Sequence, residues 1–190
     1  MTATVTARRA NIVNGINVDD LVTLVSGVQA DAHNAATHWK VTSTWQGQTH
    51  SRAQVQAFHL AGQEVKRDFT IDIDEPTELG GGNAYANPQE YLLAAVNACM
   101  TVGYVALCAL NGIRLDSLEI VTEGDIDLRG FLGLDDSVSP GYEGLDYTVR
   151  IKGDGTPEQF AAIHETVQAT SPNYHNMARN VAMRAKLVIG

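Results

Sequence analysis

The feature that most constrains the fold is a long apolar segment over residues 88–110, which carries helix signals at both ends. Asn87 is a favourable N-cap residue, Pro88 suits the first helical position, and Glu90 completes a capping box. The Asn-Gly pair after residue 110 is a typical helix stop. Because the segment is apolar nearly all round, it predicts a helix buried on most sides. Other elements must therefore pack around it.

Small residues within this predicted helix favour close contact with a second helix. Ala94, Ala95, Ala98, Gly103 and Ala106 leave room for another backbone. We therefore expect a central helix that packs on a sheet and on another helix.

The flanking segments predict the covering elements. Alternating apolar and polar residues in consecutive short segments favour antiparallel strands. A second helix is expected from Thr156, where a capping box is followed by proline, and the Ser171-Pro172 pair should end it. The expected order is strands at 38–46, 50–60 and 67–74, the long helix, strands at 117–128 and 143–152, a helix at 156–169, a short helical piece at 173–179 and a strand at 181–188. This order is typical of an α+β fold rather than of alternating βαβ units.

The N-terminal part is predicted to be an arm. Residues 1–16 look irregular, and Asn17 or Asp19 can cap a helix over 19–32. We therefore divide the chain into an arm over residues 1–36 and a main domain over residues 37–190. The arm is expected to pack on the domain or on a partner subunit.

Composition restricts the function classes. The chain has 190 residues, of which 13 are Lys or Arg and 22 are Asp or Glu, with a formal net charge of -9. A nucleic-acid partner is not expected, because phosphate binding requires a basic surface. We find no apolar run near the roughly 18 to 20 residues that span a bilayer, so no membrane partner is expected either. Two cysteines exclude a disulfide-rich scaffold, and the N-terminus lacks the apolar stretch of a secretory signal. A cytoplasmic protein with reduced thiols is the expectation.

Both cysteines fall on the predicted long helix. Cys108 follows Cys99 by nine residues, which places it about 13 Å along the helix and on the opposite side. A disulfide needs Cα atoms within about 7 Å, so the two thiols are not expected to pair. Cys99 is either a small core residue or a nucleophile, and Cys108 is expected to be a core residue.

Other reactive residue types give weaker patterns. The six histidines form no metal-binding spacing, so neither a metal nor a cofactor is expected. His164 and His175 flank Ser171-Pro172, where either could polarise a nearby group. Asp125 and Asp127 are expected to share one face of a strand, where paired carboxylates either perform acid–base chemistry or are simply solvated. The Gly80–Gly82 run lacks a following Gly-Lys-Ser/Thr and is expected to be a connection rather than a phosphate site.

Several of these motifs together resemble the OsmC/Ohr family. They lie at residues 74–76, 79–81, 87–95, 98–99, 124–134 and 171–174. The resemblance covers roughly residues 38–189, and the 124–134 motif looks like an OsmC-like subgroup. It implies an OsmC-like fold, with antiparallel sheets around two central helices, and an intertwined homodimer.

The resemblance also implies a chemistry. Active members of the family are thiol peroxidases that reduce organic hydroperoxides. The position that Cys99 matches supplies a thiolate that attacks the peroxide and becomes a sulfenic acid. A second cysteine then closes a disulfide, and an arginine and a glutamate activate the first thiol.

This sequence departs from the family pattern at three positions. Gln89 occupies the position of the family's glutamate, and the acid is displaced to Glu90, about 100° further round the helix. Ser171 replaces the second cysteine and cannot form a disulfide. The activating arginine has no clear match, with Arg52 and Arg67 as the candidates.

Three functions remain open from the sequence. The first is a one-cysteine reductase of organic hydroperoxides, in which an external thiol restores Cys99. The second is a non-catalytic homologue that binds a small hydrophobic ligand in an apolar pocket near Cys99. The third is a redox sensor in which Cys99 only signals. The candidate site residues are Cys99, Glu90, Gln89 and Ser171, with a homodimer partner in each case.

Overall fold

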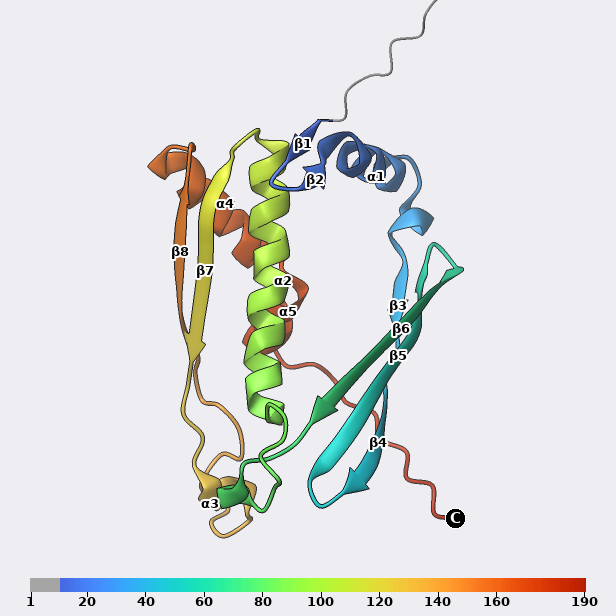
Figure 1. Cartoon of the computed structure of the whole chain (residues 1–190), viewed down its shortest axis with the longest axis vertical. Coiled ribbons are helices and arrows are strands. Elements are labelled where there is room, and N and C mark those ends of the chain that lie inside the picture. Colours follow the sequence, from blue (N-terminus) through green and yellow to red (C-terminus); the bar gives the residue numbers. More distant parts are fainter. Residues whose placement is uncertain (1–10) are drawn as a thin grey trace, which may run out of the picture. The chain divides into compact units, whose positions relative to one another are not determined.

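The computed structural model describes residues 11–190, and the chain divides into two compact units. The N-terminal unit extends to Leu92 and the C-terminal unit begins at Leu93, so the boundary falls within the long helix α2 (Pro88–Leu110). The elements are labelled in Figure 1. The predicted division at residue 36 stays a prediction.

The N-terminal unit begins with a small hairpin that we did not predict. Strands β1 (Ile12–Val13) and β2 (Ile16–Asn17) pair antiparallel across the Asn14-Gly15 turn. Both turn residues have positive φ, 52° and 77°, which is the conformation that Asn-Gly favours in tight hairpins. The expectation of irregular structure up to residue 16 is therefore wrong for this hairpin, and residues 1–10 lie outside the described part of the chain.

The predicted arm helix is confirmed as α1 (Val18–Ala30), which is followed by the short helix η1 (Ala32–Ala35). The side chain of Asn17 accepts a hydrogen bond from the Asp19 amide, so Asn17 is the cap. The apolar residues Val22, Leu24 and Val25 of α1 are exposed.

A four-stranded antiparallel sheet forms the main part of this unit. Strand β5 (His50–Leu60) pairs with β3 (Thr37–Trp39), β4 (Thr42–Gly47) and β6 (Gln63–Ile73). The antiparallel prediction is confirmed. The predicted first strand is divided between β3 and β4, and β6 begins four residues earlier than expected. The Ala61-Gly62 turn has positive φ at both residues and continues the pairing directly from Leu60 to Gln63.

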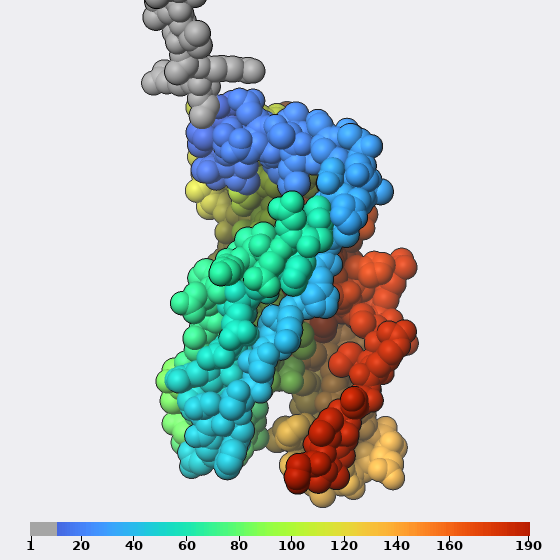
Figure 2. Space-filling view, turned by 90° about the vertical axis from the view of Figure 1, so that its right-hand side faces the viewer, coloured from blue at the N-terminus to red at the C-terminus, as the bar shows by residue number. Residues whose placement is uncertain are grey.

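This sheet leaves large apolar side chains exposed. The exposed fraction is 65% for Trp39, 74% for Trp45 and 54% for Phe69. Strands β4, β5 and β6 lie side by side as a broad surface in Figure 2. Only Ala53 among the hydrophobic residues of these strands is buried.

The glycine-rich connection folds around a buried carboxylate. Asp74 is 3% exposed, and its Oδ2 accepts hydrogen bonds from the Gly82 and Ala84 amides. The Thr49 hydroxyl donates to the other oxygen at 2.6 Å. The Glu75 carbonyl oxygen would lie 1.8 Å from a Cβ at position 81, so Gly81 is required by close packing. The run, with the short helix η2 (Thr77–Leu79), is thus the tight connection that we expected.

Helix α2 has the predicted bounds and both predicted ends. The Asn87 side chain accepts from the Glu90 amide at 2.9 Å, and Glu90 accepts from the Asn87 amide at 2.7 Å. Gly112 has a φ of 70° beyond the helix. At 23 residues α2 is long and apolar enough to span a bilayer by length and composition, contrary to our expectation. The expectation of a helix buried on most sides is wrong for the single chain, because only five of its residues are buried: Val96, Met100, Tyr104, Cys108 and Ala109.

The C-terminal unit is built around that core. Strands β7 (Leu115–Glu123) and β8 (Asp146–Gly153) form an antiparallel hairpin beside α2 (Figure 1). Helices α4 (Pro157–Thr170) and α5 (Pro172–Ala178) complete the unit. A Cβ added at Gly103 of α2 would lie 3.2 Å from the Val167 side chain of α4, which confirms the predicted close approach of a second helix. The buried residues are Val96, Met100, Tyr104, Cys108, Ile113, Ile163 and Val167.

Two predicted strand segments are not strands. Residues 124–127 leave the sheet and lead into the short helix α3 (Leu128–Phe131), because Asp127 caps that helix. The predicted final strand at 181–188 has no regular structure. Its alternating apolar residues are highly exposed, including Met183 at 91% and Leu187 at 84%. A strand needs a partner to satisfy its backbone groups, and no described segment pairs with this one.

Candidate functional site

The structure brings Cys99 and Ser171 together from positions 72 residues apart. The Ser171 hydroxyl donates to the Cys99 sulfur, with the two atoms 3.4 Å apart. Cys99 lies on α2 and is half-buried, whereas Ser171 lies at the joint between α4 and α5 and is 5% exposed. The residue at the position of the family's second cysteine therefore touches the candidate nucleophile.

The local sequence explains why Ser171 is held so firmly. Its amide donates to the Val167 carbonyl and ends α4, because the following Pro172 disfavours a helical residue before it. Its hydroxyl oxygen accepts from the Tyr174 amide at 3.4 Å and so caps α5. The backbone amide of Ser171 thus ends α4, while its side chain caps α5 and contacts the thiol.

Two asparagines that the sequence did not point to connect neighbouring elements to α2. Asn173 donates from its side chain to the Ala95 carbonyl at 2.9 Å, which ties α5 to α2 one turn before Cys99. Asn97 donates to the Ile120 carbonyl at 3.2 Å and accepts from Thr122 at 2.5 Å, which ties α2 to β7. Asn173 lies in the 171–174 motif, but only the tertiary structure reveals the hydrogen bonds that these two residues make.

A cavity of about 350 Å³ lies in the same unit. One of its walls, Val96, precedes Cys99 by one helical turn, and another, Tyr174, follows Ser171 by one turn. Cys99 itself is not among the lining residues. The remaining lining residues are Thr122, Tyr142, Glu143, Gly144, Leu145, Tyr147, Met177 and Ala178.

A second set of aromatic groups lies further along α2. The Tyr104 hydroxyl is hydrogen-bonded to Nδ1 of His164, so this histidine is a satisfied part of the core. Burial raises the pKa of Tyr104 to about 12. Burial also raises the pKa of the Cys108 thiol, which is fully buried, so Cys108 is the core residue that we expected.

Glu90 and Gln89 lie at the N-terminal end of α2 and are exposed. The Glu90 carboxylate is occupied by the capping box with Asn87. Nine residues separate Glu90 from Cys99, or about 13 Å along a helix. The family pattern gives a catalytic role to a glutamate at the position of Gln89, and a role for Gln89 or Glu90 stays a prediction.

The two candidate arginines have different surroundings within the N-terminal unit. Arg52 donates from Nε to Asp72 at 2.8 Å, and His50 contacts the same carboxylate oxygen at 2.8 Å. These hydrogen bonds lower the pKa of Asp72. Arg67 instead lies over the Phe69 ring, 4.7 Å from its centroid. Arg52 is therefore held by an acid, and Arg67 by an aromatic ring.

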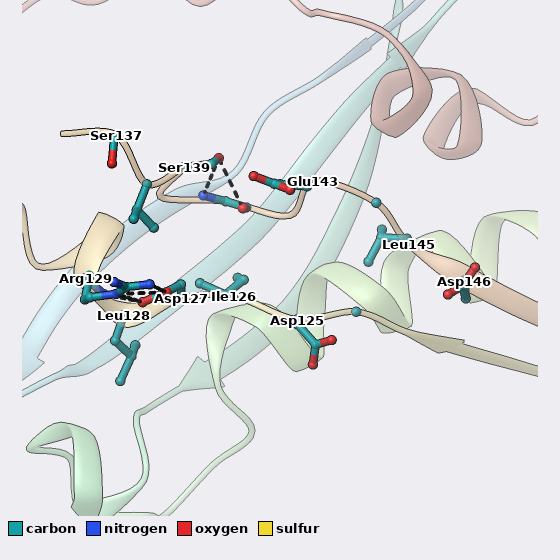
Figure 3. A pocket seen from close by; sticks show the side chains of 14 residues that line it. Asp125, Ile126, Asp127, Leu128, Arg129, Ser137, Ser139, Glu143, Leu145 and Asp146 are labelled. Carbon is teal, nitrogen blue, oxygen red and sulfur yellow. Dashed lines mark hydrogen bonds and ion pairs between the residues drawn. The ribbon is translucent and has the colours of Figure 1, made fainter. Parts of the chain in front are cut away.

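The loop between β7 and β8 lines an open cavity of about 910 Å³ (Figure 3). The expectation that Asp125 and Asp127 share a strand face is wrong, because both lie after the end of β7. Asp127 is paired with Arg129, and the Arg129 side chain lowers the pKa of Asp127 to about 2. Over residues 11–190 no three acidic, histidine or cysteine side chains are grouped closely enough to hold a metal.

The comparisons with known proteins identify the family of this chain. The family model described as OsmC-like protein matches residues 80–186, which is more than half of the chain. The chain belongs to the OsmC-like protein family. The matched range contains Cys99, Ser171 and the cavity walls. No curated protein sequence matches the chain significantly.

Solved OsmC-like structures share the fold. An OsmC-like protein from Mycoplasma pneumoniae has a TM-score of 0.57 at 13% identity, over 74% of this chain and 86% of that one. An OsmC-like protein of unknown function from Vibrio cholerae has a TM-score of 0.51 at 12% identity, over 73% and 92%. A putative osmotic stress induced and detoxification response protein from Psychrobacter arcticus has a TM-score of 0.54 at 12% identity, over 71% and 85%. At these identities the similarity shows the fold alone.

Proposed function

We propose that the protein is a thiol peroxidase that uses Cys99 alone to reduce organic hydroperoxides. The observation that carries this proposal is the contact between the Cys99 sulfur and the Ser171 hydroxyl. In the family pattern the position of Ser171 holds a second thiol, so this contact supports a site that has the first thiol alone. Cys108 is buried on the same helix and cannot replace it.

The reaction balances with an external thiol as the reductant. The Cys99 thiolate attacks the terminal oxygen of the hydroperoxide, so that an S–O bond forms, the O–O bond breaks and the alcohol leaves with a proton. An external thiol then attacks the sulfenic acid, forming a mixed disulfide and releasing water. A second external thiol breaks that disulfide and returns Cys99 to the thiol.

Ser171 is a positioning residue in this scheme. Its hydroxyl is fixed by the α4–α5 joint and orients the Cys99 sulfur without forming a covalent bond. The family pattern also requires an activating acid and an arginine, for which Gln89 and Glu90, and Arg52 and Arg67, are the candidates from the sequence. These assignments are part of the proposal.

We also propose that the protein works as a homodimer. The N-terminal sheet, the α1 face and the C-terminal tail all expose large apolar side chains, which single subunits of soluble proteins rarely leave uncovered together. The residues after 180 alternate in the manner of a strand and have no partner within the described chain. Analytical ultracentrifugation at micromolar concentration should give a dimer, and a stable monomer would contradict this.

The cytoplasm is the proposed compartment. Both cysteines are free, and a free nucleophilic thiol persists best where the surroundings are reducing.

The proposed activity is tested with the purified protein, cumene hydroperoxide and a small dithiol. Peroxide loss should be abolished in Cys99→Ser and retained in the matched Cys108→Ser variant. A dimedone adduct should form on Cys99 of the wild type. Peroxide consumption that persists in Cys99→Ser, or the lack of both consumption and adduct in the wild type, would reject the proposal.

The 350 Å³ cavity favours a second candidate, a homologue that binds a small hydrophobic ligand without chemistry. In that case Cys99→Ala should keep the ligand affinity, and the wild type should show no peroxide consumption.

A further inference from the structure

We propose that the cavity beside Cys99 and Ser171 is selective for an aromatic ring, so that the preferred ligands are aryl compounds rather than linear alkyl ones. This inference deepens the proposed function and rests on it, since it names the ligand class of that site. It also holds for the second candidate, because ring binding does not require the thiol to react.

The walls of the cavity carry the selectivity. Three tyrosines, Tyr142, Tyr147 and Tyr174, and the thioether of Met177 line a space of about 350 Å³. This volume is near the lower end of the range for small-molecule sites, which run from about 300 Å³ upward. Aromatic rings and thioethers both gain from contact with a further ring, beyond the burial of apolar area. A flat ring therefore uses these walls better than a flexible chain does.

The tyrosine walls are held in place before any ligand arrives. The Tyr147 hydroxyl accepts a hydrogen bond from Gln168 of α4. The rings of Tyr147 and Tyr174 meet edge to face, with centroids 6.0 Å apart. The Tyr174 backbone is fixed in turn by the hydrogen bond that its amide donates to the Ser171 hydroxyl oxygen. A preformed wall spares the entropy of ordering these side chains when the ligand binds.

The position of the cavity fixes which part of a ligand meets the thiol. Val96 and Tyr174 are each one helical turn from the Cys99–Ser171 pair. A peroxide group carried close to a ring between these walls would lie nearer to the sulfur than one at the end of a long chain, as on the carbon next to the ring in cumene hydroperoxide.

Binding is tested without chemistry by using Cys99→Ser and two alcohols, 2-phenyl-2-propanol as the aryl probe and 1-octanol as the linear probe. Chemical-shift titration in the full-length protein gives both dissociation constants. We expect the aryl alcohol to bind about tenfold more tightly, from the aromatic contacts. Equal affinities, tighter binding of 1-octanol, or no binding of the aryl alcohol would overturn the inference.

Wall variants locate the binding. Tyr174→Leu should weaken aryl binding about tenfold, while Tyr174→Phe, which keeps the ring, should stay within about twofold. Met177→Ala should weaken it by about threefold, and Met183→Ala, the matched change in the exposed tail, should have no effect. Should Tyr174→Leu fail to fold, the two methionine variants alone decide the result, and equal aryl affinity in both would overturn the inference.

The two proposals fail in different ways. Aryl binding without peroxide consumption keeps the cavity assignment and rejects the thiol chemistry. Consumption of cumene hydroperoxide and of a linear hydroperoxide at equal rates, without aryl-selective binding, keeps the chemistry and rejects the ring selectivity.

Discussion

The two units of the chain are similar in length but bury their apolar residues very differently. In the C-terminal unit, α2 and α4 enclose a core in which Met100, Cys108 and Val167 have no exposed surface. In the N-terminal unit, four paired strands hold a single buried hydrophobic residue, Ala53, and two tryptophans stand out in solvent. The C-terminal unit has a hydrophobic core of its own, whereas the N-terminal sheet is held mainly by backbone hydrogen bonds between its strands.

This difference shows that a chain can form regular secondary structure without burying a hydrophobic core. Strand pairing satisfies backbone groups, but stability comes mainly from removing apolar surface from water. We infer that a second subunit covers the exposed apolar side chains of the sheet. The C-terminal unit, in contrast, is stabilised by its own buried core. Four predictions test this contrast.

The largest expected effect comes from linking the helices of the C-terminal unit. In oxidised Ser171→Cys, the introduced thiol should form a disulfide with Cys99, because the Ser171 hydroxyl oxygen already lies 3.4 Å from the Cys99 sulfur. Closing a loop of about 70 residues should add about 4 kcal/mol to the free energy of unfolding, less a cost for the lost cap. Urea unfolding of the oxidised and reduced variant measures this. A mass spectrum in which every thiol of the variant is still free after oxidation would contradict the close contact between positions 99 and 171.

Core truncation should separate the two units directly. Met100→Ala should lower the free energy of unfolding by about 3 kcal/mol at any protein concentration. Phe69→Ala, on the exposed sheet, should cost less than about 0.5 kcal/mol in dilute protein and more as concentration rises. Urea titrations at several concentrations test the contrast. A concentration-independent loss of equal size in both variants would contradict it.

Alkaline pH should weaken the C-terminal unit through Tyr104. Its folded pKa of about 12 lies above the ordinary value of 10, so the folded state holds this proton more tightly than the unfolded state does. The contribution is complete below pH 10 and is lost as the pH rises toward 12, by about 2 kcal/mol. Tyr104→Phe should lose less stability over that interval, as measured by urea unfolding at each pH. Parallel losses in both proteins would count against this.

Acid should act on the N-terminal unit through Asp72, with the smallest effect. Arg52 and His50 lower the pKa of Asp72, so its contribution is present above the ordinary aspartate pKa of about 4 and is lost as the pH falls below that value. Asp72→Asn should be less stable at neutral pH and should lose less on acidification. Circular dichroism of the sheet between about pH 2 and 5 follows this, with Asp116→Asn as the control. Identical acid curves for wild type and Asp72→Asn would show that the pair contributes nothing.

Local signals predicted much of the fold. The caps at Asn87 and Thr156 are short-range patterns of side chain and backbone, and both helices begin where these patterns place them. The apolar character of 88–110 likewise predicted a central helix. The Asn14-Gly15 hairpin carries an equally clear turn signal, which we overlooked.

The parts that failed depend on partners distant in the sequence. The alternation over 181–188 is a strand pattern, but a pattern cannot supply the neighbouring strand. For the site, the family resemblance related Cys99 to Ser171, whereas the cavity walls come from four separate segments with no common motif. Asn97 and Asn173 were missed for the same reason, because their partners are backbone carbonyls of other elements.

The joint at Ser171 has a consequence for how such a chain can evolve. A serine there closes one helix and opens the next, and a hydroxyl performs that capping task better than a thiol does. A serine in place of the family's second cysteine therefore gives a capped joint where the family pattern has an internal redox partner. In the one-cysteine peroxidase that we propose, regeneration depends on thiols outside the protein, so its turnover would follow the thiol supply of its cell.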